Sequence, residues 1–154
     1  LLIVAMHFGV EYTHVPTNYQ IDMAEFLSSL GVDIIIGTHP HVIMPITYIN
    51  DTLVIYSLGN FLSAQDTNND YNTTVGLLSS IKITKNIDKD NNSSIKLSDL
   101  NNELIYTTNK DGYKIIPFSN PDIKDYLNDY ERVYNKYANI VRSIDSSINI
   151  NSLS

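Results

Sequence analysis

Two histidines separated by one proline, His39 and His41, are the residues of this sequence best suited to metal chemistry. Imidazole is a common ligand of zinc, manganese and iron, and it binds through one ring nitrogen while the other is held by a hydrogen-bond acceptor. A His-x-His pair by itself is a weak motif. On the residue types alone, a metal site and a structural role are therefore about equally open.

The histidine pair follows a short run of branched apolar residues, 34–36, and Gly37. A continuous apolar run is typical of a strand buried on both faces. Gly37 lets the backbone leave that strand, and Pro40 favours an extended conformation for His39. Open α/β sheets hold their ligands beyond the carboxyl ends of their strands, so this stretch is the candidate site.

A third histidine, His7, ends an earlier apolar stretch over residues 1–6. Residues 17–30 between the two stretches predict a helix, whose apolar face is expected from Ile21, Ala24, Leu27 and Leu30, widened by Met23 and Phe26. Strand, helix and strand make a right-handed unit with parallel strands, which end at the same edge of a sheet. We therefore expect His7 to approach the histidine pair.

Two further polar side chains in this region were considered for the site. Glu11 is open to three interpretations, as a ligand, as an acceptor behind a ligand, or as a solvated carboxylate, and the solvated one is favoured. His14 follows no strand end, so we interpret it as a surface residue.

The rest of the chain predicts further strands and one long helix. The helix is expected to begin at Asn120 and Pro121 and to continue to residue 144, with a frayed tail over 145–154. The expected strands cover residues 46–49, 53–58, 75–84, 94–100, 104–107 and 113–118.

Composition excludes several classes of function. The net charge of −7 and the pI of 4.8 argue against a nucleic-acid partner. The sequence has no cysteine, hence no disulfide and no thiolate ligand. No run reaches the roughly 18 to 20 apolar residues of a membrane span. Because the chain opens directly on a strand-like run without an initiator methionine, we expect it to be the carboxyl-terminal part of something longer.

Three blocks, at residues 7–12, 31–42 and 56–61, together with Gln20 between the first two, resemble the CapA/PgsA family of bacterial capsule or poly-γ-glutamate biosynthesis proteins. The resemblance covers about residues 3–65 closely and the later elements loosely. It implies an α/β fold, part of a calcineurin-like metallophosphoesterase α/β/β/α sandwich. Residues 1–118 would then be the carboxyl-terminal part of such a domain, with a helix over 119–144 packed on it and the tail of 145–154 beyond.

The same resemblance assigns roles to particular residues. His7, His39 and His41 would bind one or two divalent metal ions, manganese, zinc or iron, and Glu11 and Asn60 would contact these ligands or the substrate. The loop has the order Gly-Thr-His-Pro-His, one residue longer than the Gly-His-x-His pattern of the wider superfamily. The catalytic general acid is expected upstream, in the missing amino-terminal half of the domain, so this chain would hold at most half a site.

Three functions remain open at this stage. The first is a capsule or poly-γ-glutamate biosynthesis protein with a metal-dependent hydrolase or transferase site, anchored at the cell surface through an upstream segment. The second is a non-catalytic scaffold that binds the capsular polymer or its synthesis and export machinery. The third is a general phosphodiesterase.

Overall fold

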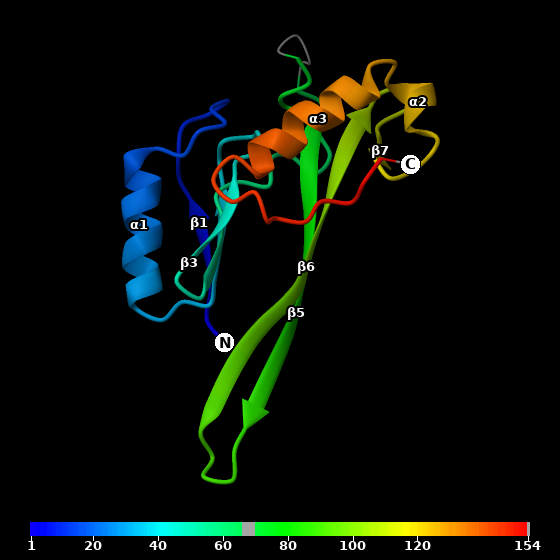
Figure 1. Cartoon of the computed structure of the whole chain (residues 1–154). Coiled ribbons are helices and arrows are strands. Elements are labelled where there is room, and N and C mark those ends of the chain that lie inside the picture. Colours follow the sequence, from blue (N-terminus) through cyan, green and yellow to red (C-terminus); the bar gives the residue numbers. More distant parts are fainter. Residues whose placement is uncertain (66–69, 154) are drawn as a thin grey trace.

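The computed structural model describes residues 1–65 and 70–153 and shows two β-sheets with helices packed on them (Figure 1). The predicted α/β class is confirmed. The first sheet contains β1 (Ile3–His7), β2 (Ile34–Thr38), β3 (Ile46–Ile49) and β4 (Thr52–Ile55). The second contains β5 (Val75–Ile87), β6 (Ser93–Thr108) and β7 (Lys114–Pro117), and the helices are α1 (Asn18–Ser29), α2 (Ile123–Tyr126) and α3 (Tyr130–Val141).

The first sheet has the strand order β1-β2-β4-β3. β1, β2 and β4 are parallel to one another. β3 is antiparallel to β4, and the turn between these two strands contains Asn50 with a φ of 52°. β2 therefore lies between two partners, and its apolar run is largely buried, as predicted. β1 lies at the end of the strand order with Ile3 exposed, so this apolar strand is not buried on both faces as β2 is.

Helix α1 begins with a capping box formed by Thr17 and Gln20. Thr17 Oγ1 accepts a hydrogen bond from the Gln20 backbone N–H, and Gln20 Oε1 accepts one from the Thr17 backbone N–H. Gln20, Ala24 and Ser28 are the buried residues of the helix. Leu30 and Phe26 are exposed, so the predicted apolar face is rotated from the observed one, because a buried glutamine contributes to it.

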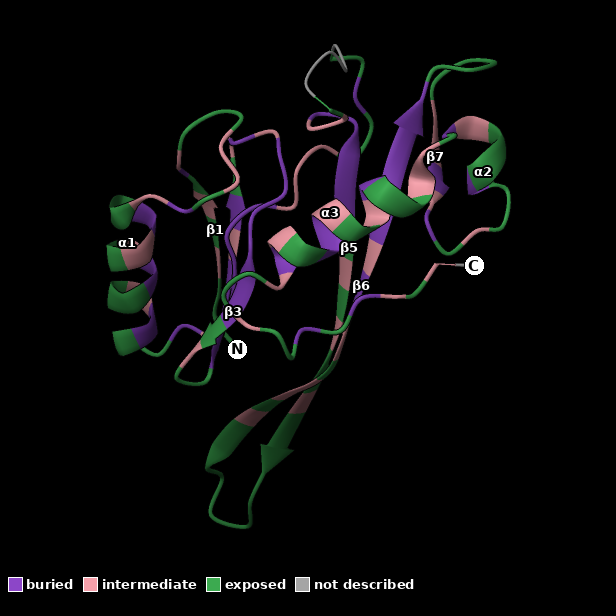
Figure 2. Ribbon diagram, turned by 45° about the horizontal axis from the view of Figure 1, so that its top comes forward, coloured by how far each residue is buried: buried purple, intermediate pink, exposed green. Residues whose placement is uncertain are grey.

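The second sheet is dominated by one long hairpin. Figure 1 shows β5 and β6 extending well beyond the body of the molecule, and Figure 2 shows that their far ends are exposed. The two strands predicted over 94–100 and 104–107 are in fact the single strand β6. Asn102, which lies between the two predicted ranges, is buried and hydrogen-bonded, since its amide donates to Asn149 O at 2.8 Å and its Oδ1 accepts from Ser79.

The predicted helix over 119–144 is interrupted. Leu127 has an extended backbone with a φ of −142°, and it separates α2 from α3. The apolar periodicity continues across this break because both helices bury residues in the same core, among them Ile123 and Val133. Periodicity alone therefore could not locate the interruption.

Residues 145–153 are not frayed. Ile148 and Ile150 are buried, and the Arg142 side chain donates to Ile148 O at 2.9 Å. Asn151 donates from its backbone to Asn102 O and from its amide to Glu103. These contacts hold the segment against β6, although Ser146, Ser147, Asn149 and Ser152 are exposed.

The two faces of the first sheet pack in separate cores. One core lies between this sheet and α1 and contains Phe8, Ala24, Val32, Ile35, Met44, Val54 and Tyr56. The larger core joins the other face to the second sheet and to α2 and α3. No helix in the described ranges is long and apolar enough to cross a membrane.

Candidate functional site at the edge of the first sheet

The carboxyl ends of β1 and β2 bring three of the four histidines together. His7 is paired with Thr38 in the parallel register, so its neighbour in the adjacent strand directly precedes His39. The ring centroids of His7 and His39 are 4.6 Å apart, and those of His39 and His41 are 6.4 Å apart. The convergence expected from the strand-helix-strand unit is therefore present.

The loop that holds the histidine pair has an unusual backbone. His39 has a φ of +100° and His41 a φ of +61°, so the expectation of an extended His39 is wrong. Pro40, between them, is buried, and its carbonyl accepts a hydrogen bond from the Tyr12 backbone N–H at 2.8 Å. A left-handed backbone costs on the order of 1–3 kcal/mol per non-glycine residue. Surrounding contacts must offset that cost, and residues under such strain cluster at functional sites.

Gly37 is required where β2 leaves the sheet. A Cβ atom at this position would lie 2.0 Å from Tyr56 O and 2.7 Å from the Phe8 ring. The glycine thus allows the chain after β4 to pass directly against β2. This close approach also places the segment that carries Asn60 beside the histidine loop.

Asn60 orients the ring of His41. Its Oδ1 lies 3.0 Å from His41 Nδ1, while its Nδ2 donates to Ser63 Oγ, Gln65 Oε1 and Thr73 O at 3.2, 2.9 and 3.0 Å. The carbonyl of Thr73 can only accept, which fixes the orientation of the amide. His41 Nδ1 therefore carries the proton, and its Nε2 keeps the lone pair that a metal ion would need.

Two side chains from the loop after β1 lie beside His41. Glu11 Oε1 is 3.7 Å from His41 Nε2, and the Tyr12 ring stacks on the imidazole at 6.1 Å between centroids. The Glu11 side chain is half exposed. It faces the open nitrogen of His41 from the solvent side.

His14 is not a surface residue, contrary to the prediction. Its Nδ1 lies 2.7 Å from Ile43 O, and its Nε2 lies 3.2 Å from Asn72 Oδ1. The Tyr137 ring meets the imidazole edge-on at 5.8 Å. Both ring nitrogens are thus engaged by the segments that precede β3 and β5, and the ring itself contacts α3 through Tyr137, so His14 has a structural role.

The sequence missed the side chains that hold Asn60. Ser63 and Gln65 follow it within five residues, and Ser63 is buried while the apolar Phe61 and Leu62 before it are exposed. Because this burial is opposite to what the residue types suggest, the sequence gives no signal that would identify them.

The donor atoms of this site are suited to a metal ion, but they do not complete a site. Three imidazoles and one carboxylate are ligands that zinc, manganese or iron accept. Within residues 1–65 and 70–153, however, no group of three or more His, Asp or Glu side chains is placed to hold one ion. The three histidines could therefore supply part, but not all, of the ligands of a metal ion.

Comparison with known sequences shows what the amino-terminal part of the chain resembles. Residues 1–65 match the family described as "Bacterial capsule synthesis protein PGA_cap", which belongs to the metallophosphoesterase-like superfamily. This segment, 42% of the chain, is therefore similar to the CapA/PgsA family. It contains His7, Glu11, His39, His41 and Asn60.

Two relatives show how much of such a protein is matched. Over 65 residues the chain is 45% identical to the PGA biosynthesis protein CapA of Bacillus subtilis (strain 168) and 38% identical to the capsule biosynthesis protein CapA of Bacillus anthracis. Each match covers 42% of this chain, and it covers 17% and 16% of the respective relatives. The match thus spans about one sixth of the length of these proteins.

Proposed function

We propose that this chain serves capsule or poly-γ-glutamate biosynthesis as part of a metal-dependent hydrolase of phosphoesterase type. The names of the two relatives and the family match of residues 1–65 support the biological role. The observation that carries the chemical role is the hydrogen bond between Asn60 Oδ1 and His41 Nδ1, which leaves Nε2 open beside His7 and His39.

In this proposal the three histidines supply nitrogen ligands from one sheet edge. Asn60 keeps His41 in the binding tautomer, and the buried Pro40 and close-fitting Gly37 hold the loop in place. Glu11 is positioned to accept a proton or a hydrogen bond at the solvent side. A divalent cation, when bound, supplies a water of lowered pKa and a Lewis acid for a phosphoryl or acyl centre. The remaining ligands and the general acid are proposed to lie outside these residues.

A non-catalytic scaffold is the second candidate. It is favoured by the incomplete ligand set of the described residues. The net charge of −7 also disfavours direct contact with an anionic polymer unless a cation bridges the two. In either role we propose the capsular polymer or its synthesis and export machinery as the partner, and the cell surface as the location.

Metal content tests the two candidates directly. The protein as its cell produces it is purified and analysed by elemental mass spectrometry, beside a His39→Ala/His41→Ala variant and a His14→Ala control. Near-stoichiometric manganese, zinc or iron in the wild type and the control, lost in the double variant, supports the metal site. Hydrolysis of bis(p-nitrophenyl) phosphate by the loaded protein would then support the hydrolase. Absence of metal from all three proteins contradicts the hydrolase and leaves the scaffold.

A further inference from the structure

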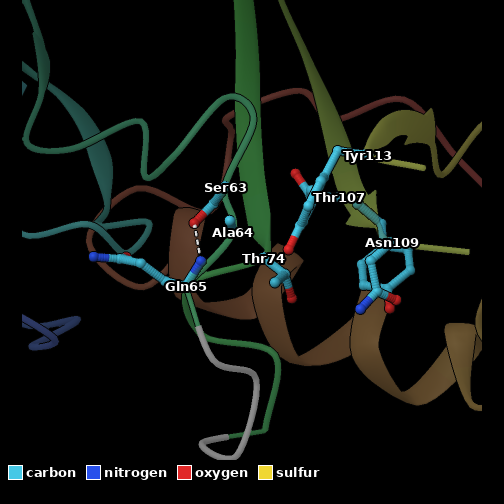
Figure 3. Close-up of a pocket in the computed structure, with 8 residues that line it drawn as sticks. Ser63, Ala64, Gln65, Thr74, Thr107, Asn109 and Tyr113 are labelled. Atoms are coloured by element: carbon cyan, nitrogen blue, oxygen red, sulfur yellow. Dashed lines mark hydrogen bonds between the residues drawn. The ribbon is translucent and has the colours of Figure 1, made fainter.

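A cleft of about 320 Å³ lies next to the histidine site, between the loop after β4 and the end of the second sheet. Figure 3 shows Ser63 and Gln65 on one side of it and Thr107, Asn109 and Tyr113 on the other. Its volume is at the lower end of the roughly 300–1,000 Å³ typical of small-molecule sites. The full lining consists of Ser63, Ala64, Gln65, Thr74, Tyr106, Thr107, Asn109 and Tyr113.

We propose that this cleft binds a neutral carbohydrate unit. None of its eight lining residues is charged, and the groups that line it are hydroxyls, amides and two phenol rings. The cleft is joined to the histidine site because Asn60, which orients His41, donates hydrogen bonds to both Ser63 and Gln65. The inference depends on the cleft alone and does not require the metal site.

The floor of the cleft, formed by the buried residues Ser63, Thr74 and Thr107, favours a ligand that both donates and accepts hydrogen bonds. Ser63 Oγ accepts from the Asn60 amide and the Gln65 backbone, and its own proton has no acceptor among residues 1–65 and 70–153, so it can donate to a ligand. Thr107 Oγ1 donates to Phe61 O and Thr74 Oγ1 donates to Tyr71 O, so both keep lone pairs to accept. All three residues are buried, and the floor thus offers one donor and two acceptors.

This pattern distinguishes a sugar from a polyanion. A sugar hydroxyl can donate to the two threonines and accept from Ser63, whereas a carboxylate only accepts and would face two acceptors. The absence of a cation among the lining residues also disfavours a carboxylate polymer such as poly-γ-glutamate. A polyhydroxylated, uncharged ligand fits the floor on both counts.

The rim of the cleft provides an aromatic surface. Tyr113 is 55% exposed and Asn109 is also exposed, and no hydrogen bond of either side chain is found within the described part of the chain. An exposed aromatic ring packs well against the C–H face of a sugar, while the neighbouring amide can bond its hydroxyls. Tyr113 and Asn109 are therefore the residues whose loss should weaken binding most without harming the fold.

Isothermal titration calorimetry of the full 154-residue chain with maltotriose and with chitotriose, in the presence of EDTA, tests the proposal. We expect millimolar or tighter binding of at least one of these sugars, weakened about fivefold or more in Tyr113→Ala and in Asn109→Ala. Tyr19→Ala is the matched control, because Tyr19 is 59% exposed but lies on α1. Circular dichroism of each variant establishes that it is folded.

Three results would overturn the proposal. They are no binding of either sugar at millimolar concentration, binding that both cleft variants leave unchanged, and binding of tri-γ-glutamate in preference to the sugars. Because EDTA removes divalent ions, failure of the metal proposal would not alter the outcome, and the two proposals can fail separately.

Discussion

Asn60 Oδ1 lies 3.0 Å from His41 Nδ1, although the two residues come from different loops and are 19 positions apart in the sequence. The Asn60 amide is fixed in turn by three acceptors that its nitrogen contacts. One of them, Thr73 O, can only accept, so the nitrogen must face it. One imidazole of the cluster is therefore preorganised with Nε2 free. Histidines that bind metal ions are commonly held by such a hydrogen bond at their other ring nitrogen.

Replacement of Asn60 by leucine should weaken metal binding while His41 itself remains. Without the acceptor at Nδ1, the ring populates both tautomers and rotates more freely. We expect the affinity for Mn²⁺ to fall about 10- to 100-fold. Electron paramagnetic resonance titration measures the affinity, and ¹⁵N NMR of the imidazole reports the tautomer. An unchanged affinity with a mixed tautomer population would show that the hydrogen bond does not serve metal binding.

Gly37→Ala should destabilise the protein far more than an alanine at an open glycine. The new Cβ would lie 2.0 Å from a backbone oxygen of Tyr56, so the β2–β4 contact must open. We expect a loss of about 3 kcal/mol or more in the free energy of unfolding. Gly112→Ala is the control, because its φ is +91° but no atom lies within 4 Å of its Cβ position, and about 1 kcal/mol is expected there. Equal losses in urea denaturation would contradict the close approach.

His14→Phe should lower stability without affecting metal binding. The substitution keeps a ring against Tyr137 but leaves Ile43 O and Asn72 Oδ1 without the imidazole. We expect a loss of about 1–3 kcal/mol in the free energy of unfolding, measured by urea denaturation. His7→Phe, at an exposed strand end, serves as the comparison and should cost much less. A larger effect at His7 than at His14 would reverse the assigned roles.

The contact between Asp70 and α3 should weaken in acid, because it depends on the ionised carboxylate of Asp70. Hydrogen bonds from Arg132 and then from Lys136, each 2.8 Å long, lower the pKa of Asp70 from 3.8 to about 2. Because its pKa is lower in the folded state, the ionised Asp70 stabilises the fold at pH values above the ordinary pKa of 3.8. This stabilisation is lost as the pH falls from about 4 towards 2. Because Asp70 is 45% exposed, solvent screening limits the contribution to below about 1 kcal/mol.

Asp70→Asn should remove this dependence. Its unfolding free energy, compared with that of the wild type by urea denaturation across the same pH range, should differ most at neutral pH and converge in acid. Asp99→Asn is the control, because Asp99 forms a longer 3.6 Å pair with Lys82 on the exposed hairpin. A wild-type advantage that grows in acid would contradict the assignment.

The amino-terminal part of the fold could be predicted because local signals and packing agree there. The apolar run of β2 and the helix ended by Gly31 set the parallel unit, and this unit brings His7 to the histidine pair. The left-handed backbone of His39 was not predictable, because Pro40 by itself favours an extended conformation there and tertiary contacts override that local preference.

The carboxyl-terminal part was harder to predict because polar residues are buried in it. Asn102 lies inside β6 with its hydrogen bonds satisfied, and it therefore reads as a loop residue in the sequence. The structural role of His14 is not visible in the sequence, because its partners, Ile43 and Asn72, are 29 and 58 positions away. Long-range hydrogen bonds of this kind produce no periodic pattern of residue types in the sequence.

The most direct test of the histidine site is a Mn²⁺ titration of the ¹⁵N-labelled chain followed by NMR of its four imidazoles. We expect the signals of His7, His39 and His41 to broaden at the lowest Mn²⁺ concentrations, while His14, engaged at both nitrogens, is the last to change. The broadening should vanish in the His39→Ala/His41→Ala variant. Equal broadening of all four imidazoles, or no broadening before general loss of signal, would contradict a metal-binding role for this sheet edge.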